Sequence, residues 1–182
     1  MVVSPRIVVR RAETRDGPVL QAIERAAGER FRSVGLAAIA DDDPFPLDEL
    51  DGYVARRRSW VAVDDAGAVM GYLLVDDVDG CAHVEQVSVD PDHQGRGVGR
   101  SLIDHVDDWA RADGRPALTL TTFTDVPWNR PLYEHLGFRV LGEDEIGPEL
   151  RAVRDAEAAH GLDPQRRVCM RRDLPPPSPS TG

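Results

Sequence analysis

The sequence contains no lysine, and all 22 of its basic residues are arginine. A phosphate-binding P-loop needs a lysine after its last glycine, so this absence excludes that class of nucleotide site. Arginine at every basic position is typical of a GC-rich coding sequence, and we expect a bacterial source.

Cysteines and long apolar runs are also scarce. Cys81 and Cys169 are far apart and lack metal-ligand spacing, so we expect reduced thiols in a cytoplasmic protein and no metal site. No apolar run reaches membrane-spanning length, and the N-terminus lacks the order of a signal peptide, so we expect no membrane partner. The net charge of −10 argues against a nucleic-acid partner, because phosphate backbones select basic surfaces.

The length of 182 residues suits one domain with a substantial core. We expect this domain over residues 7–174 and a disordered Pro/Ser-rich tail over 175–182. Hydrophobic periodicity predicts strands at residues 7–10, 60–63, 69–75, 81–89, 117–123, 138–141 and 168–171. It predicts helices beginning near Pro18 and over residues 47–58, 98–113, 128–136 and 148–160, with an acidic loop at 35–46.

A glycine-rich hexad at residues 94–99 lies between a β-rich run and an amphipathic helix. The first N–H groups of a helix have no intrahelical partner, and the helix dipole adds partial positive charge, so such a loop suits a phosphate or pyrophosphate. The dinucleotide fingerprint G-x-G-x-x-G fails because Arg100 occupies its third glycine position. The spacing is instead Q-x-x-G-x-G, formed by Gln94, Gly97 and Gly99.

This hexad resembles the acetyl-CoA signature of the GNAT N-acetyltransferase family, and the order of predicted elements resembles the family fold over nearly the whole chain. An ordinary glycine-rich turn is the alternative. The resemblance implies an α/β (α+β) fold with a mixed, mostly antiparallel sheet of about seven strands, flanked by helices. Two neighbouring parallel strands, at residues 81–89 and 117–123, would splay apart to admit coenzyme A. The implied cofactor-binding residues are Val87, Val89, Gln94, Gly95, Arg96, Gly97, Val98, Gly99, Arg100, Ser101 and Asn129.

The resemblance also implies a general acid and a base for acetyl transfer to an amine. The segment at residues 132–138, LYEHLGF, is similar to a family helix whose tyrosine faces the thiol sulfur, so Tyr133 is the candidate acid. Asn129 would contact the pantetheine arm or cap the short helix. Glu85 is the candidate base and His83 shares its strand face, although Glu85 could instead pair with an arginine. The next strand offers threonines at 119, 121 and 122 and no carboxylate.

The acceptor is less well specified. We expect direct attack by a small-molecule amine in a ternary complex, because neither cysteine has an evident activating partner. The alternatives are an acetyltransferase that acts on the N-terminus or on lysines of a peptide or protein, and a non-catalytic acyl-CoA sensor. The sequence is also compatible with a homodimer. Phe31, Phe45 and the aspartates 41–43 could form a pocket for a cationic amine, although a solvated loop is the alternative. The extra helix at residues 148–160 would form part of the acceptor wall or an oligomer contact.

Overall fold

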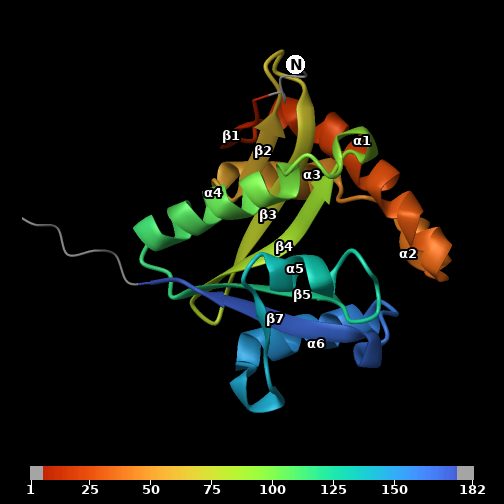
Figure 1. Cartoon of the computed structure of the whole chain (residues 1–182), viewed down its shortest axis with the longest axis vertical. Helices are drawn as coiled ribbons and strands as arrows, with labels where there is room; N and C mark the ends of the chain where they lie inside the picture. The colour runs from red at the N-terminus through yellow and green to blue at the C-terminus, as the bar shows by residue number, and fades with distance from the viewer. Residues whose placement is uncertain (1–5, 176–182) are drawn as a thin grey trace, which may run out of the picture. The chain divides into compact units, whose positions relative to one another are not determined.

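A computed structural model describes residues 6–175, which form two compact units (Figure 1). The first unit takes in the described residues up to Val75 together with Gln86–His105, and the second takes in Asp76–Glu85 and the chain from Val106 onward. Apart from Pro175, the predicted tail lies outside the described residues.

The first unit is an antiparallel sheet packed against helices. Strand β1 (Val8–Arg11) pairs with β2 (Ser59–Val63), and β2 pairs with β3 (Val69–Val78), with an irregularity between Ala62 and Val63. Helices α1 (Gly17–Gly28), α2 (Ala37–Ala40) and α3 (Leu47–Ala55) lie between β1 and β2 in the chain. Its core includes Leu20, Ile23, Leu50, Val61, Tyr72 and Leu74, with Phe45 packed against it.

The second unit is built around β5 (Ala117–Phe123) and β7 (Arg167–Asp173), which run antiparallel side by side (Figure 1). Short strand β6 (Arg139–Val140) pairs with the outer edge of β7. Helices α5 (Arg130–His135) and α6 (Pro148–Ala159) complete the unit. Its core comprises Val78, Leu141, Ile146, Leu150 and Cys169.

Strands β3 and β4 (Cys81–Val89) and helix α4 (Val98–Ala112) contribute to both units. The strands hydrogen-bond in the order β1-β2-β3-β4-β5-β7-β6, and β4 with β5 is a parallel pair. The parallel ladder consists of Ala82–Leu118 and His83–Thr119, although β5 continues to Phe123. This mixed seven-stranded sheet with flanking helices confirms the predicted fold class.

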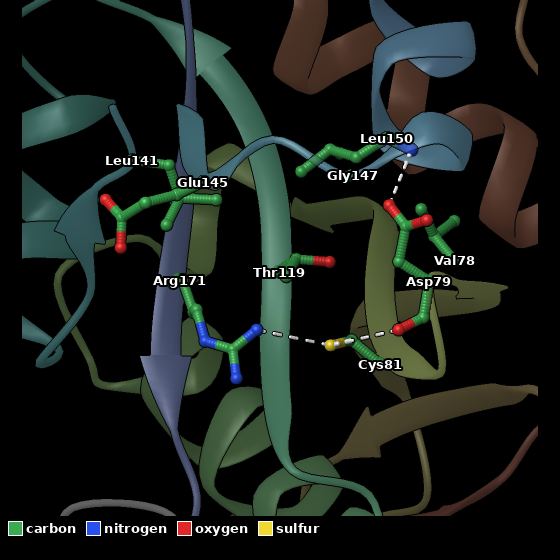
Figure 2. Close-up of a pocket in the computed structure, with 9 residues that line it drawn as sticks. All are labelled: Val78, Asp79, Cys81, Thr119, Leu141, Glu145, Gly147, Leu150 and Arg171. Atoms are coloured by element: carbon green, nitrogen blue, oxygen red, sulfur yellow. Dashed lines mark hydrogen bonds between the residues drawn. The ribbon is translucent and has the colours of Figure 1, made fainter. Parts of the chain in front are cut away.

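Helix α6 has an unusual N-terminal cap, supplied from the tight turn that joins β3 to β4. The carboxylate of Asp79 accepts a hydrogen bond from the backbone N–H of Glu149 at 3.0 Å. It accepts a second from the N–H of Leu150 at 2.9 Å, which Figure 2 shows. In return the Glu149 carboxylate accepts from the Asp79 N–H. A Cβ at Gly147 would clash with the Asp79 carboxylate, so a side chain at this position would displace the cap.

Several predicted bounds differ from the structure by one to three residues, such as the end of β3 at Val78 and the end of α3 at Ala55. Two differences have identifiable reasons. The segment at 35–46 was predicted to be a loop, but Ala37–Ala40 forms a single helical turn that is too short to show periodicity. Strand β7 extends beyond 168–171 to Arg167 and Asp173, because these charged residues pair with Phe123 and Ala117 across the sheet. None of the helices in residues 6–175 is both long and apolar enough to cross a membrane.

Candidate active site

The glycine-rich loop begins with a tight turn that directs the chain into α4. The Asp90 side chain accepts a hydrogen bond from the N–H of Asp92 at 2.8 Å, and a short 3₁₀ turn follows to His93. Gly95 and Gly97 then adopt φ angles of 73° and 83°, in the left-handed region that favours glycine. Nothing lies within 4 Å of the position that a Cβ would take at either glycine, so the surface of the loop is open.

The loop presents a continuous row of unpaired backbone donors. Within residues 6–175, the N–H groups from Gly95 to Arg100 meet no hydrogen-bond acceptor, and Ser101 is the first to bond, to the carbonyl of Gly97 at 2.9 Å. Six consecutive free N–H groups at the start of a 15-residue helix form a strong site for an anion. The exposed side chains of Arg96 and Arg100 add positive charge on either side of Gly97.

The end of β4 lies close to this loop in the same unit. A Cβ at Gly71 of β3 would stand 2.8 Å from the carbonyl oxygen of Ser88 and 3.1 Å from Val98, so the strand and the helix start are closely packed. The Gln94 side chain donates to the carbonyl of Val89 at 3.4 Å. Val87 and Val89 are partly buried, and their use as backbone partners of a ligand remains a prediction.

The second unit carries the predicted base. His83 Nε2 and Glu85 Oε2 are 3.8 Å apart on one strand face, while His83 Nδ1 lies 3.0 Å from the hydroxyl of Thr119. Burial lowers the pKa of His83 to about 4, so the imidazole is neutral near pH 7. Burial, reinforced by the negative charges of Asp76 and Glu157, raises the pKa of Glu85 to about 7, which suits a general base. No arginine forms an ion pair with Glu85 among the described residues.

Sequence reasoning missed a carboxylate that reaches β5 from the extra helix. Glu157 of α6 accepts hydrogen bonds from Thr121 Oγ1 and from Arg167, whose Nη2 lies 2.7 Å away. Arg167 Nη2 also donates to Thr121 at 2.8 Å, and its guanidinium lies 4.7 Å from the centre of the Phe123 ring. Strand β5 itself carries no carboxylate, as predicted, and the carboxylate beside it comes from α6. The available signal was the position of Glu157, seven residues after buried Leu150 on one helix face.

Tyr133 lies on α5 with its ring edge-on to Phe138 at 5.8 Å. The turn at Gly137, with φ 87°, ends the helix and lets the N–H of Phe138 bond to the carbonyl of Tyr133 at 3.0 Å. The Tyr133 hydroxyl has no hydrogen-bond partner within residues 6–175, and burial raises the pKa of Tyr133 to about 12. The phenol is therefore protonated at neutral pH and free to donate.

Asn129 is the N-cap residue of α5, but its side chain makes no capping bond. The alternative that the Asn129 side chain caps this helix was therefore wrong.

Two of the residues predicted to form a pocket for a cationic amine, Asp41 and Phe45, have other partners in the structure. Asp41 forms an ion pair with Arg32, which also binds Glu29 at 2.9 Å. Phe45 packs against the core and edge-on to Tyr53, with ring centres 6.2 Å apart. The charge of Asp41 is thus already compensated.

Both cysteines are free thiols in strands, as predicted, and both are buried. Burial raises the pKa of Cys169 to about 11, which makes it a poor nucleophile near neutral pH. No cluster of three or more His, Cys, Asp or Glu side chains suited to a metal occurs in the part of the chain that the structure describes.

Comparison with known proteins places this geometry in a family. The Acetyltransferase (GNAT) family profile matches residues 20–138. The chain is 27% identical over 141 residues to the peptidyl-lysine N-acetyltransferase YjaB of Salmonella typhimurium, covering 77% of this chain and 88% of that protein. It is 28% identical over 126 residues to the N-alpha-acetyltransferase RimI of Mycobacterium tuberculosis, covering 66% of this chain and 78% of the relative.

A solved structure agrees on the fold. The PaiA N-acetyltransferase of Thermoplasma acidophilum, determined in complex with coenzyme A, superposes with a TM-score of 0.70 at 13% identity and covers 92% of this chain and 99% of that one. The predicted resemblance is confirmed: the chain belongs to the GNAT acetyltransferase family and is an acyltransferase.

Proposed function

We propose that this enzyme transfers an acetyl group from acetyl-CoA to a primary amine by direct attack in a ternary complex. The observation that carries the proposal is the row of free N–H groups from Gly95 to Arg100, flanked by two arginines. It supports binding of the diphosphate of coenzyme A by main-chain donors. The residues assigned to cofactor binding on the sequence, Gln94 to Ser101 with Val87, Val89 and Asn129, are part of this proposal.

Glu85 and Tyr133 act as base and acid in the proposed reaction. The acceptor ammonium gives a proton to the Glu85 carboxylate, and the neutral nitrogen attacks the thioester carbonyl. As the C–S bond breaks, the leaving thiolate takes a proton from Tyr133, and the tyrosinate recovers a proton from the attacking nitrogen, which must lose its extra proton to become the neutral amide. A base with a pKa of about 7 and an acid with a pKa of about 12 are each in the required protonation state near neutral pH.

The acceptor class has two candidates. A small-molecule amine is the first, and it is the acceptor favoured on the sequence. An amine carried on a peptide is the second, because the relatives at 27% and 28% identity are named for peptidyl-lysine and N-alpha acetylation.

Calorimetry with acetyl-CoA tests the cofactor site, and thiol release with matched acceptors tests the reaction. We expect acetyl-CoA to bind the wild type, and thiol release to depend on an added amine. Free amines and a lysine-containing peptide, compared at equal concentration, separate the two acceptor classes. Absence of acetyl-CoA binding would refute the proposal.

A further inference from the structure

His83 is a buried histidine whose two ring nitrogens have different neighbours. It lies opposite Thr119 in the final rung of the ladder between β4 and β5, and its Nδ1 is 3.0 Å from the Thr119 hydroxyl. On the other side of the ring, Nε2 is 3.8 Å from Oε2 of Glu85, which lies two residues further along the same strand face. All three residues belong to the second unit. One imidazole therefore stands between a hydroxyl and the proposed base.

The hydrogen on this ring can be placed from its surroundings. Burial keeps the imidazole neutral near pH 7 by lowering its pKa, so only one of its nitrogens carries a hydrogen. If Nδ1 carried it, Nδ1 would donate to Thr119, whose own hydroxyl hydrogen would then have no acceptor within residues 6–175, and the Nε2 lone pair would face the Glu85 carboxylate. If Nε2 carries it, Thr119 donates to Nδ1 and the N–H bond of Nε2 faces the carboxylate. The second tautomer satisfies both the hydroxyl and the ring.

Glu85 depends on this contact because the other charges around it offer no donor. Within the part of the chain that the structure describes, its carboxylate accepts no hydrogen bond and forms no ion pair with an arginine. Asp76 of β3 and Glu157 of α6 are negative and disfavour the carboxylate form, whereas Arg167 of β7 favours it without pairing with it. The 3.8 Å separation from His83 is too long for a hydrogen bond, so the Nε2–H acts on Glu85 as a dipole on a charge. This effect depends on the orientation of the ring.

We propose that Thr119 is a positioning residue for the proposed base. Its hydroxyl anchors Nδ1 of His83, so that the ring keeps its Nε2–H directed at Glu85 and favours the carboxylate that accepts the proton. Without the hydroxyl, the buried Nδ1 would lack a partner and the ring would be free to turn its N–H away. The inference rests on the proposed function, because Thr119 has this role only if Glu85 is the base.

NMR on the ligand-free protein tests the anchoring without any need for catalysis. Nitrogen-15 couplings of the His83 ring, assigned by their loss in His83→Gln, should show a hydrogen on Nε2 and none on Nδ1 between about pH 6 and pH 8. The carbon-13 signal of the Glu85 carboxyl should titrate with a pKa of about 7 in the wild type. In Thr119→Val, which has nearly the same shape but no hydroxyl, the pKa of Glu85 should rise by about half a unit.

Two variants on β5 separate the hydroxyl from packing. Thr119→Ser keeps a hydroxyl and should keep the wild-type pKa of Glu85. Thr122→Val makes the same substitution at a residue that is equally buried but faces the other side of the strand, and it should leave that pKa unchanged. A hydrogen on Nδ1 in the wild type, or a pKa of Glu85 that is the same in Thr119→Val, would overturn the inference.

Kinetics distinguishes a failure of this inference from a failure of the proposed function. The midpoint of kcat/KM against pH should move upward in Thr119→Val by the same amount as the pKa of Glu85, because the lost N–H dipole no longer favours the carboxylate. A shift of that pKa which the kinetic midpoint does not follow would instead refute Glu85 as the base and leave the anchoring of His83 confirmed.

Discussion

The pH dependence of acetyl transfer follows directly from the environment of Glu85. Its pKa is raised to about 7, by burial first and then by the charges of Asp76 and Glu157, while Arg167 opposes the rise. Only the carboxylate form accepts a proton. For a pKa of about 7, roughly half of the molecules are active at pH 7, about a tenth at pH 6 and about nine tenths at pH 8. We therefore expect kcat/KM to rise with pH, with a midpoint near 7, and then to level off.

Two variants of one ion pair should move this midpoint in opposite directions. Glu157→Gln removes a negative neighbour and leaves the charge of Arg167 uncompensated, so the pKa of Glu85 should fall and the midpoint should move to lower pH. Arg167→Gln removes the positive charge, so the midpoint should move to higher pH. If the pair had a purely structural role, both variants would lower the rate, and the midpoint would not move in opposite directions.

The assay is thiol release at saturating acetyl-CoA across the pH range in which the protein stays folded. Two acceptors whose own pKa values differ are needed, because the titration of the amine also produces a limb in the profile. The limb from Glu85 should stay in place when the amine is changed, and Glu85→Gln should remove it and lower kcat/KM by about 100-fold. The assignment of Glu85 as base would be refuted if the profile had a single limb whose midpoint followed the amine pKa and was the same in all three variants.

Three further substitutions test other parts of the molecule. Tyr133→Phe should lower kcat by about 100-fold with the acetyl-CoA Kd unchanged in calorimetry, and an unchanged kcat would remove Tyr133 from the mechanism. Gly97→Glu should abolish acetyl-CoA binding, because it places negative charge in the anion site at a φ of 83°; retained binding would mean that the loop is misassigned. Gly71→Ala should destabilise the fold by about 1–3 kcal/mol, since its Cβ would meet the Ser88 carbonyl at 2.8 Å. The matched control Gly99→Ala, whose Cβ would make an ordinary 3.7 Å contact, should leave the melting temperature equal or higher.

Much of the fold could be predicted because the local signals were strong. The bounds of β4 and β5 were predicted correctly, since β-rich runs there stop at clear turn residues, Gly80 and Asp90 among them. The glycine-rich loop was found because its chemistry is local and resides in the backbone. Contacts between distant segments were harder to foresee, as the pairing of Arg167 with Phe123 shows.

The two carboxylates that sequence reasoning missed share one feature. Glu24 and Glu157 each lie on the face of a helix that also carries buried residues, four positions after Leu20 and seven after Leu150. Helical spacing predicted an apolar face for the helix of Glu24, whereas the helix of Glu157 is so rich in charged residues that no single one of them stands out. What each carboxylate meets depends on partners far away in the sequence, Tyr72 for one and Arg167 for the other. A charged residue on a helix face that also carries buried residues is therefore a candidate site residue.

The reciprocal bonds between Asp79 and the first turn of α6 link residues that are 70 and 71 positions apart in the sequence. The acid at the hairpin tip and the glycine at position 147 are useful only when that helix is present, because each exists to accommodate the other. We therefore expect the two to be inherited together. Aspartate at the tip with glycine before the helix would then serve as a marker for recognising which homologous chains carry the same inserted helix, and with it a counterpart of Glu157.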